Sequence, residues 1–208
     1  MPPKQFIASL DIDAQNGFTE LCPDELPIPD GQHIVAELNK QAAFAQYRLG
    51  SKDAHPAHPD WLATEQHPVL SKIQAKNMTH YWPKHCVPGT KGFNLIAGLP
   101  HPSDYDYFVW KGLEPDMHPY GACYHDLAEK LSTGLIEFLQ TRHIQAVLIG
   151  GLATDYCVKT SVLQLLQAGF EVIVNVAACR GLTPLTSQEA LEQMRIAGAK
   201  IIASSDAL

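Results

Sequence analysis

Short apolar segments alternate with helical patterns along most of this chain, and the alternation limits the possible folds more than any other feature. The segments that predict buried strands are residues 6–12, 107–110, 146–149, 172–176 and 200–203. Those that predict helices are residues 34–49, 127–141, the stretch after Cys157, and 187–197. Repeated strand–helix–strand units favour a parallel sheet with helices on both faces. We therefore predict a three-layer α/β/α fold with a mainly parallel central sheet.

Length and composition point to a single folded domain. The chain has 208 residues, enough for one domain with a substantial core and too few for two comfortable ones. We therefore expect one domain over residues 1–208. Apolar residues make up 46% and charged residues 18% of the chain, which is typical of an ordinary globular protein. The net charge is −7 and no Lys/Arg-rich block occurs, so we expect no nucleic-acid partner.

Segments that direct a protein to a membrane or an oxidising compartment are not evident in the sequence. The start MPPKQ leads directly into the first apolar segment, and no stretch of about 18 apolar residues follows. The five cysteines are odd in number and show no CxxC spacing, so a disulfide framework is not indicated. We expect a cytoplasmic protein with reduced thiols and no membrane partner, and homo-oligomerisation remains open.

Cys157 lies where an apolar run passes through Gly150 and Gly151 into a helical pattern. This position predicts a cysteine at a helix N-terminus, where free N–H groups and the helix dipole stabilise a thiolate near neutral pH. Such a thiolate is a nucleophile beside ready oxyanion donors. The alternative is a buried cysteine that packs as a small hydrophobic residue.

Polar residues follow three of the predicted strands. Asp13 comes just after the first strand, Lys111 follows residues 107–110, and the loop to Cys157 follows residues 146–149. If these strands are parallel, the three residues emerge at one edge of the sheet. An ammonium near a thiol favours the thiolate, and a carboxylate can take and return its proton. Taken singly, each residue has a simpler explanation, a solvated Lys at a strand end and an Asp that caps a turn. It is their convergence that favours a catalytic group.

Residues 50–106 are rich in Pro, His and Gly, and we expect a functional, metal-binding loop region there. Asp53 and His55 are two residues apart, and His85 follows a Trp-Pro-Lys sequence. One carboxylate and two imidazoles with open positions suit one divalent metal ion such as Zn, Fe or Mn. The alternative is that these are polar loop residues, since the DxH pattern is common.

Five sequence motifs in a fixed order resemble those of a known family. They are DAQNGF at residues 13–18, KDAHP at 52–56, WPKHC at 82–86, KG at 111–112 and GLATDYCV at 151–158. With these motifs, nearly the whole chain resembles the nicotinamidases (pyrazinamidases) of the isochorismatase-like cysteine hydrolase superfamily. The resemblance implies Cys157 as nucleophile, Asp13 as the proton acceptor and donor that serves it, and Lys111 as the cation beside the thiolate.

The resemblance also implies how metal and substrate are held. Asp53, His55 and His85 would be the metal ligands. Phe18 and Trp82 would flank a pyridine ring whose nitrogen faces the metal. The backbone N–H groups of Ala153 and Cys157 would form the oxyanion hole, and the peptide bond between Leu152 and Ala153 would be cis.

The chain departs from the family pattern at two places. Gly17 stands where the family usually has a second Asp. The family often has a further histidine a few residues past the position of His55, and here His58 and His67 are the candidates for a fourth protein ligand.

The reaction implied is hydrolysis of nicotinamide to nicotinate and ammonia through a cysteine thioester, with analogues such as pyrazinamide as further substrates. One alternative is a sister cysteine amidohydrolase acting on another small amide, such as an N-carbamoyl compound or a maleamate; those relatives generally lack the DxH and WPxH pair. Another is a catalytically silent metal-binding or thiol-sensing protein. Isochorismate hydrolysis is disfavoured because it does not need the cysteine.

Overall fold

The computed structural model describes residues 1–208 and contains one sheet of six parallel strands. The strand order is β3-β2-β1-β4-β5-β6. The strands are β1 (Ile7–Ile12), β2 (Tyr47–Asp53), β3 (Tyr107–Lys111), β4 (Ala146–Leu152), β5 (Glu171–Arg180) and β6 (Lys200–Ile202). The α-helices are α1 (Val35–Ala42), α2 (Leu135–Thr141), α3 (Lys159–Gln167) and α4 (Pro184–Ile196).

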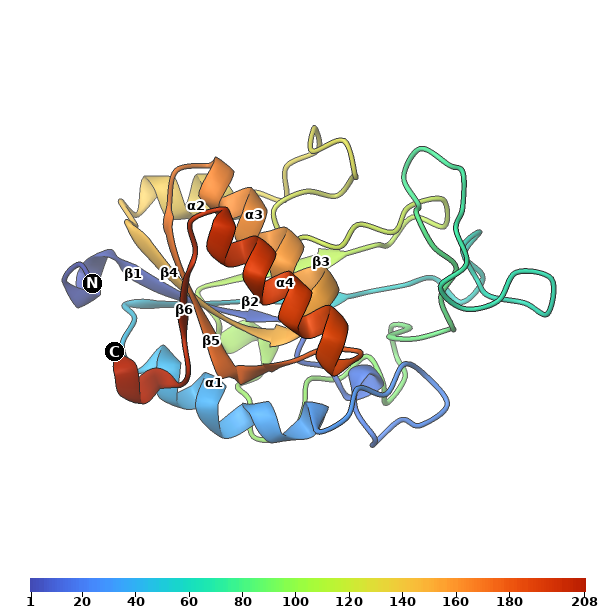
Figure 1. Ribbon diagram of the computed structural model, residues 1–208, viewed down its shortest axis with the longest axis horizontal. Coiled ribbons are helices and arrows are strands. Elements are labelled where there is room, and N and C mark those ends of the chain that lie inside the picture. Colours follow the sequence, from blue (N-terminus) through green and yellow to red (C-terminus); the bar gives the residue numbers. More distant parts are fainter.

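Helices cover both faces of the sheet, which confirms the predicted three-layer fold. Figure 1 shows α1 below the sheet and α2, α3 and α4 on the opposite side. Side chains of β4 alternate accordingly: Val147 and Ile149 join the largest apolar cluster, which includes residues of α2, α3 and α4, whereas Ala146 and Leu148 join a cluster on the other face. This alternation is the pattern of a strand buried on both faces.

Strand β2 was not predicted, and the helix predicted over residues 34–49 is wrong in its second half. Helix α1 ends at Ala42, and the chain then enters β2, which lies between β1 and β3. The sequence YRLGSKD of β2 is poor in residues with high β-propensity. Its pairing with two neighbours overrides that propensity. Gly50 permits close packing, because a Cβ there would lie 2.6 Å from the ring of Phe108.

Helix α2 begins later than predicted, because residues 127–134 form turns instead. The Asp126 carboxylate accepts hydrogen bonds from the backbone N–H groups of Lys130 and Leu131, both at 2.9 Å. Such local bonds offer the backbone an alternative to the helix. Gly134 then adopts a left-handed conformation with φ of 84° at the start of α2. Helix α4 begins earlier than predicted, because the Thr183 hydroxyl caps its N-terminus.

The long connection between β2 and β3 contains no α-helix and no strand of the sheet. Its teal and green segments extend beyond the carboxyl ends of the strands at the right of Figure 1. No helix of the protein is long and apolar enough to cross a bilayer.

Candidate active site

The sheet brings the predicted polar residues together at the carboxyl ends of its central strands. Asp13 follows β1, Asp53 ends β2, and Lys111 ends β3. Asp53 and Lys111 are direct partners in the register of β2 and β3. Cys157 follows β4, which pairs with β1 on its other edge. The residues therefore lie near the point where the strand order reverses, which is where such sheets bind ligands.

Lys111 occupies the centre of the polar group and is completely buried. Its Nζ lies 2.9 Å from Asp13 Oδ2 and 3.6 Å from Cys157 Sγ, and it donates a short hydrogen bond to Asp53 Oδ1. The predicted trio of Asp13, Lys111 and Cys157 is thus assembled, with Asp53 as an additional partner. Burial alone would lower the pKa of Lys111, but the two carboxylates hold it well above its usual value.

Two further residues fix the carboxylates, and sequence reasoning missed both. The Ser51 hydroxyl donates a 2.6 Å hydrogen bond to Asp13 Oδ1. The Gln15 side chain accepts from the Asp53 backbone N–H at 2.8 Å and donates to the Asp53 carbonyl at 2.9 Å. Ser51 precedes Asp53 by two residues on β2, so both side chains face the same way. Recognition of β2 as a strand would have revealed Ser51.

The structure corrects the prediction that the Cys157 thiol ionises near neutral pH. Burial raises its pKa well above the usual value, and the lowering effect of Lys111 is opposed by Asp13 and Asp53. The helix position also differs, because Cys157 lies within a π-helical turn, Thr154–Val158, that precedes α3. A thiol in this setting stays protonated until a base takes its proton.

Asp13 is the base best placed to take that proton. Its carboxylate and the Cys157 sulfur belong to one cluster of atoms within 4.8 Å of one another, and a hydrogen bond to Asp13 contributes to the raised thiol pKa. Burial also raises the pKa of Asp13, although Lys111 and Ser51 oppose the shift. A carboxylate of raised pKa is the stronger proton acceptor.

The segment between β4 and the π-helical turn carries free backbone donors. The Leu152–Ala153 peptide bond is cis, as the resemblance implied. The Ala153 carbonyl accepts from the N–H groups of Tyr156 and Val158, both at 3.1 Å, whereas the Ala153 N–H donates no hydrogen bond to the backbone. This N–H is therefore available to a bound oxyanion.

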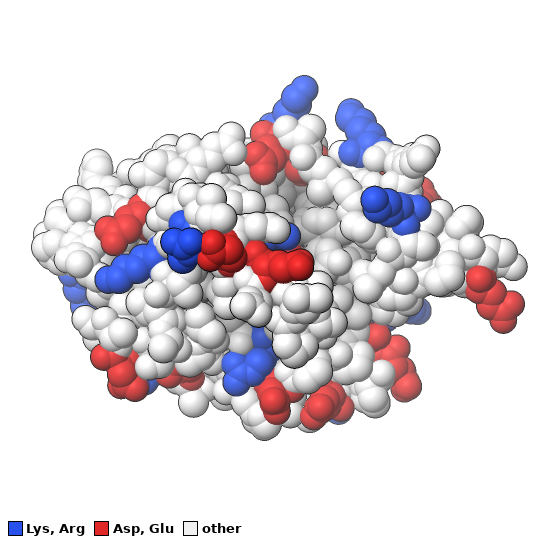
Figure 2. Space-filling model, in the orientation of Figure 1, with Lys and Arg blue, Asp and Glu red and all other residues white.

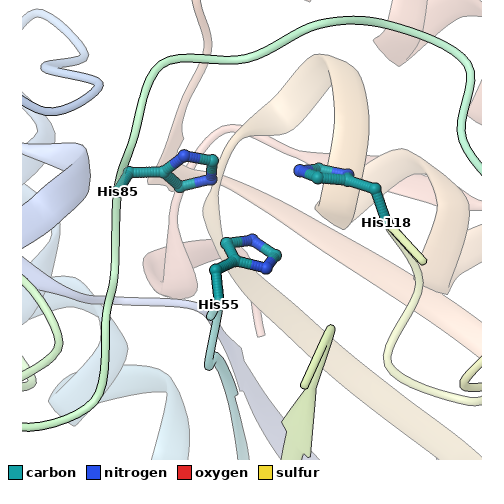
Figure 3. A group of neighbouring side chains, drawn as sticks. All are labelled: His55, His85 and His118. Atoms are coloured by element: carbon teal, nitrogen blue, oxygen red, sulfur yellow. The ribbon is translucent and has the colours of Figure 1, made fainter. Parts of the chain in front are cut away.

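Three buried histidines face one another beside this group of polar residues. Figure 3 shows His55, His85 and His118 entering from three separate segments with their rings directed toward a common space. One nitrogen of each lies within 4.8 Å of the others. His55 Nδ1 pairs with the Gly112 carbonyl at 3.1 Å and His85 Nδ1 with the Pro83 carbonyl at 2.6 Å. These bonds place the proton on Nδ1 and leave Nε2 with its lone pair, the arrangement of metal-binding imidazoles.

The donor set fits a divalent metal ion. The Asp53 carboxylate reaches this cluster, since its Oδ2 lies 3.4 Å from His55 Nε2. His55 Nε2 is buried without a hydrogen-bond partner. Burial lowers the pKa of His85 to about 3, so its imidazole is neutral and can ligate. Burial and neighbouring histidines also hold the pKa of His118 well below its usual range.

His118 was not predicted, and the two histidines considered for a fourth ligand lie elsewhere. His58 and His67 are exposed, and His67 stacks on Tyr81 with 4.6 Å between ring centroids. His118 comes from the loop after β3, far in sequence from the KDAHP motif. Only the sheet topology brings that loop to His55, so spacing along the chain gave no signal.

A small aromatic cavity connects the histidines to the thiol. The cavity, which opens to solvent, has about 280 Å³ of empty space and is lined by Phe18, Leu26, Asp53, Trp82, His85, His118, Tyr120, Ala153, Tyr156, Cys157 and Leu182. The two aromatic residues predicted to flank a substrate ring, Phe18 and Trp82, are both in the wall. The Trp82 indole N–H donates to the Tyr120 hydroxyl at 3.2 Å, which fixes its ring.

Glu25 occupies the space beside Gly17, the position where the family usually has Asp. A Cβ at Gly17 would lie against Glu25 Oε2 and 2.8 Å from Cys86 Sγ. Glu25 Oε2 also accepts from the Cys86 backbone N–H at 2.8 Å. A carboxylate from another segment thus holds the chain next to His85.

Comparisons with known proteins show the family to which the chain belongs. A family model described as the isochorismatase domain matches residues 8–206. The chain belongs to the isochorismatase family. A nicotinamidase of Escherichia coli (strain K12) is 33% identical over 216 residues, covering 99% of this chain and 97% of that protein. The motif resemblance is thereby confirmed.

Two solved structures share the fold at similar sequence distance. A nicotinamidase/pyrazinamidase of Acinetobacter baumanii has a TM-score of 0.88 and 28% identity, covering 98% of this chain and 99% of that chain. A pyrazinamidase of Pyrococcus horikoshii in complex with zinc has a TM-score of 0.75 and 27% identity, covering 95% and 98%.

Proposed function

We propose that this protein is a nicotinamidase that hydrolyses nicotinamide to nicotinate and ammonia. The observation that carries the proposal is that Lys111 contacts both Asp13 and Cys157, and that Cys157 lines an aromatic cavity together with His85 and His118. The nicotinamidase of Escherichia coli (strain K12), which matches nearly the whole chain, supports the same substrate.

In the acylation step, Asp13 takes the proton of the Cys157 thiol while the sulfur attacks the carboxamide carbon. The carbonyl oxygen becomes an oxyanion, which accepts hydrogen bonds from the N–H groups of Ala153 and Cys157. Asp13 then gives its proton to the amide nitrogen, the C–N bond breaks, and ammonia leaves a thioester on Cys157. Lys111 keeps its charge throughout and limits the cost of negative charge at the sulfur.

In the deacylation step, the same Asp13 carboxylate activates water. Water adds to the thioester carbon, the C–S bond breaks, and the sulfur recovers a proton from Asp13 as nicotinate leaves. One carboxylate thus serves both halves of the reaction. Ser51 keeps that carboxylate in place through its hydrogen bond to Oδ1.

Asp53, His55 and His85 would hold one divalent metal ion beside the cavity. When bound, the ion supplies a Lewis-acid position for the pyridine nitrogen, which orients the ring and brings the carboxamide to the sulfur. Zn, Fe and Mn all suit mixed carboxylate and imidazole ligands. Zinc is the first choice, because the pyrazinamidase of Pyrococcus horikoshii was solved with zinc.

The cavity favours a small, uncharged aromatic amide. Phe18 and Trp82 supply flat apolar walls, and eight of the eleven lining residues are hydrophobic. On the face seen in Figure 2, acidic and basic side chains are interspersed, so no field of one sign covers it. An uncharged carboxamide needs no electrostatic steering. Nicotinamide and analogues such as pyrazinamide meet these requirements.

Release of ammonia and nicotinate from nicotinamide by the purified protein tests the proposal. Turnover that disappears in Cys157→Ala supports it. Inactivity of metal-loaded wild-type protein toward nicotinamide, with hydrolysis of an N-carbamoyl compound or maleamate, would identify a sister amidohydrolase instead. Inactivity toward every amide would indicate a binding or sensing protein.

A further inference from the structure

We propose that His118 is a fourth protein ligand of the divalent metal, which would then be held by three imidazoles and the Asp53 carboxylate. The inference rests on the metal site of the proposed function and adds a ligand to it. Its basis is the cluster in which one nitrogen of His118 lies within 4.8 Å of nitrogens of His55 and His85 (Figure 3). A tetrahedron with metal–nitrogen bonds of about 2.1 Å has edges of roughly 3.4 Å, so small ring rotations suffice.

The hydrogen bonding of His118 requires an explanation that the protein alone does not supply. The residue is only 3% exposed, and neither Nδ1 nor Nε2 has a hydrogen-bond partner. Burying unpaired polar atoms costs free energy, and such atoms in folded proteins usually have an ion, water or ligand as partner. A metal ion beside His55 and His85 provides that partner for one of the two nitrogens.

Hydrogen bonds and packing hold the backbone around His118, and they place its ring beside the other two histidines. The His118 N–H donates to the Asn77 carbonyl at 2.8 Å, and the Trp61 indole N–H donates to the Met117 carbonyl at 3.0 Å. Trp61 also contacts His118 edge to face, with 4.5 Å between ring centroids. Loop and ring are therefore held against the histidine cluster from two sides.

Packing accounts for the plane of the His118 ring but not for its bare nitrogens. The ring lies nearly parallel to His55, at 4.8 Å and 21°, and to Trp82, at 5.7 Å and 13°. An apolar or aromatic side chain would stack in this slot without burying two polar atoms. The choice of histidine is explained when one nitrogen ligates.

A fourth protein ligand changes which metal ions the site prefers. Three imidazoles and one carboxylate favour Zn and its neighbours in the transition series over Mg and Ca, which prefer oxygen ligands. The ion must also exceed four-coordination if it is to accept the pyridine nitrogen. With His118 as the fourth protein ligand, the pyridine nitrogen would be a fifth ligand.

Metal binding in the absence of substrate tests this assignment separately from activity. Zn affinity is measured by competition with a chromophoric chelator for wild type, His118→Asn and the matched control His67→Asn, which replaces an exposed histidine. We expect His118→Asn to bind Zn at least 10- to 100-fold more weakly and His67→Asn to match wild type. The visible spectrum of the Co-loaded protein should change in His118→Asn, because its ligand field loses a nitrogen.

Thermal unfolding keeps the test decisive if His118→Asn also weakens the fold. A bond between His118 and the metal can stabilise only the metal-loaded protein. His118→Asn should therefore lower the Tm of the Zn-loaded form more than that of the metal-free form. Equal losses in both forms would overturn the proposal. Unchanged Zn affinity together with an unchanged Co spectrum would also overturn the proposal. If KM for nicotinamide then rose in His118→Asn, the result would mean that His118 contacts the substrate and not the metal.

Discussion

The Ser51 hydroxyl donates a 2.6 Å hydrogen bond to Asp13 Oδ1 from inside the sheet. The Ser51 oxygen in turn accepts from the Asp13 backbone N–H at 3.3 Å. The pair joins the carboxyl end of β1 to β2 and holds the base that the proposed reaction uses twice.

Replacement of Ser51 should therefore shift the pH dependence of turnover. The Ser51 hydrogen bond lowers the pKa of Asp13, so Ser51→Ala raises it, and the active carboxylate form is lost at higher pH than in wild type. The acid limb of the kcat/KM profile should move to higher pH. At pH values below that limb, Ser51→Ala should have roughly tenfold lower kcat/KM than wild type. The control Ser51→Thr keeps a hydroxyl. An acid limb that stays in place in Ser51→Ala would contradict a role for Asp13 as the titrating base.

Cys157→Ala should abolish amide hydrolysis, because no other thiol lines the cavity. Cys157→Ser should be nearly inactive, since a hydroxyl ionises far less readily. Asp13→Asn should lose about three or more orders of magnitude in kcat, because Asp13 handles protons in successive steps. Ammonia release measures all three, with circular dichroism as the check on folding and Cys22→Ala as the control. More than a few per cent of wild-type turnover in Cys157→Ala would remove it as nucleophile.

Alkylation of Cys157 by iodoacetamide should be slow at neutral pH and should accelerate only in alkaline solution. Its pKa is raised by burial, and Lys111 is the group that lowers it. Lys111→Met raises the thiol pKa further, so alkylation at a given pH should slow, whereas Lys111→Arg keeps a cation and should react more like wild type. Mass spectrometry of the modified peptide gives the rates. Identical rates in Lys111→Met and wild type would mean that the ammonium does not influence the sulfur.

Gly17→Asp should destabilise the protein even though it restores the residue usual in the family. The new side chain would meet Glu25 and Cys86, and overpacking of this kind costs about 1–3 kcal/mol. The Tm should fall, and Zn content should fall with it, because Cys86 is next to His85. The double variant Gly17→Asp/Glu25→Ala should recover much of both losses. Failure of this double variant to recover either would show that Glu25 does not occupy the position of the family carboxylate.

Removal of the metal with a chelator should raise KM for nicotinamide more than it lowers kcat, because the proposed role of the ion is to bind and orient the ring. His55→Ala should reproduce the effect, and added Zn should restore the chelated wild type but not the variant. Full activity in protein shown to be metal-free would overturn both the site and its role.

The sequence predicted the layers of the fold and the proximity of Asp13, Lys111 and Cys157, because each depends on local pattern. Runs such as AVLI in β4 read as buried strands, and the residues that follow a parallel strand must lie at its carboxyl end. Strand β2 was missed because Ser51, Lys52 and Asp53 are polar, whereas buried strands are usually apolar. The same polar residues contribute to the candidate site. Functional residues often contradict local structural preference.

The positions of His118 and Glu25 could not be predicted from the sequence, for a different reason. His118 meets His55 only after β3 has paired with β2 and the following loop has folded back over the sheet edge. Glu25 fills the space beside Gly17 from a neighbouring loop. Neither relation leaves a periodicity or a spacing in the chain. Contacts of this kind arise from tertiary packing alone.

Because Asp53 and Lys111 are paired in the register of β2 and β3, the candidate site forms only when these two strands pair correctly. A slip of one residue between β2 and β3 would turn one of these side chains toward the α1 face. Such a species would retain its strand content and much of its compactness, yet it would lack the buried ion pair and the cation beside the sulfur. The specific activity per folded molecule should therefore report whether the edge strand β3 has paired with β2 in the correct register.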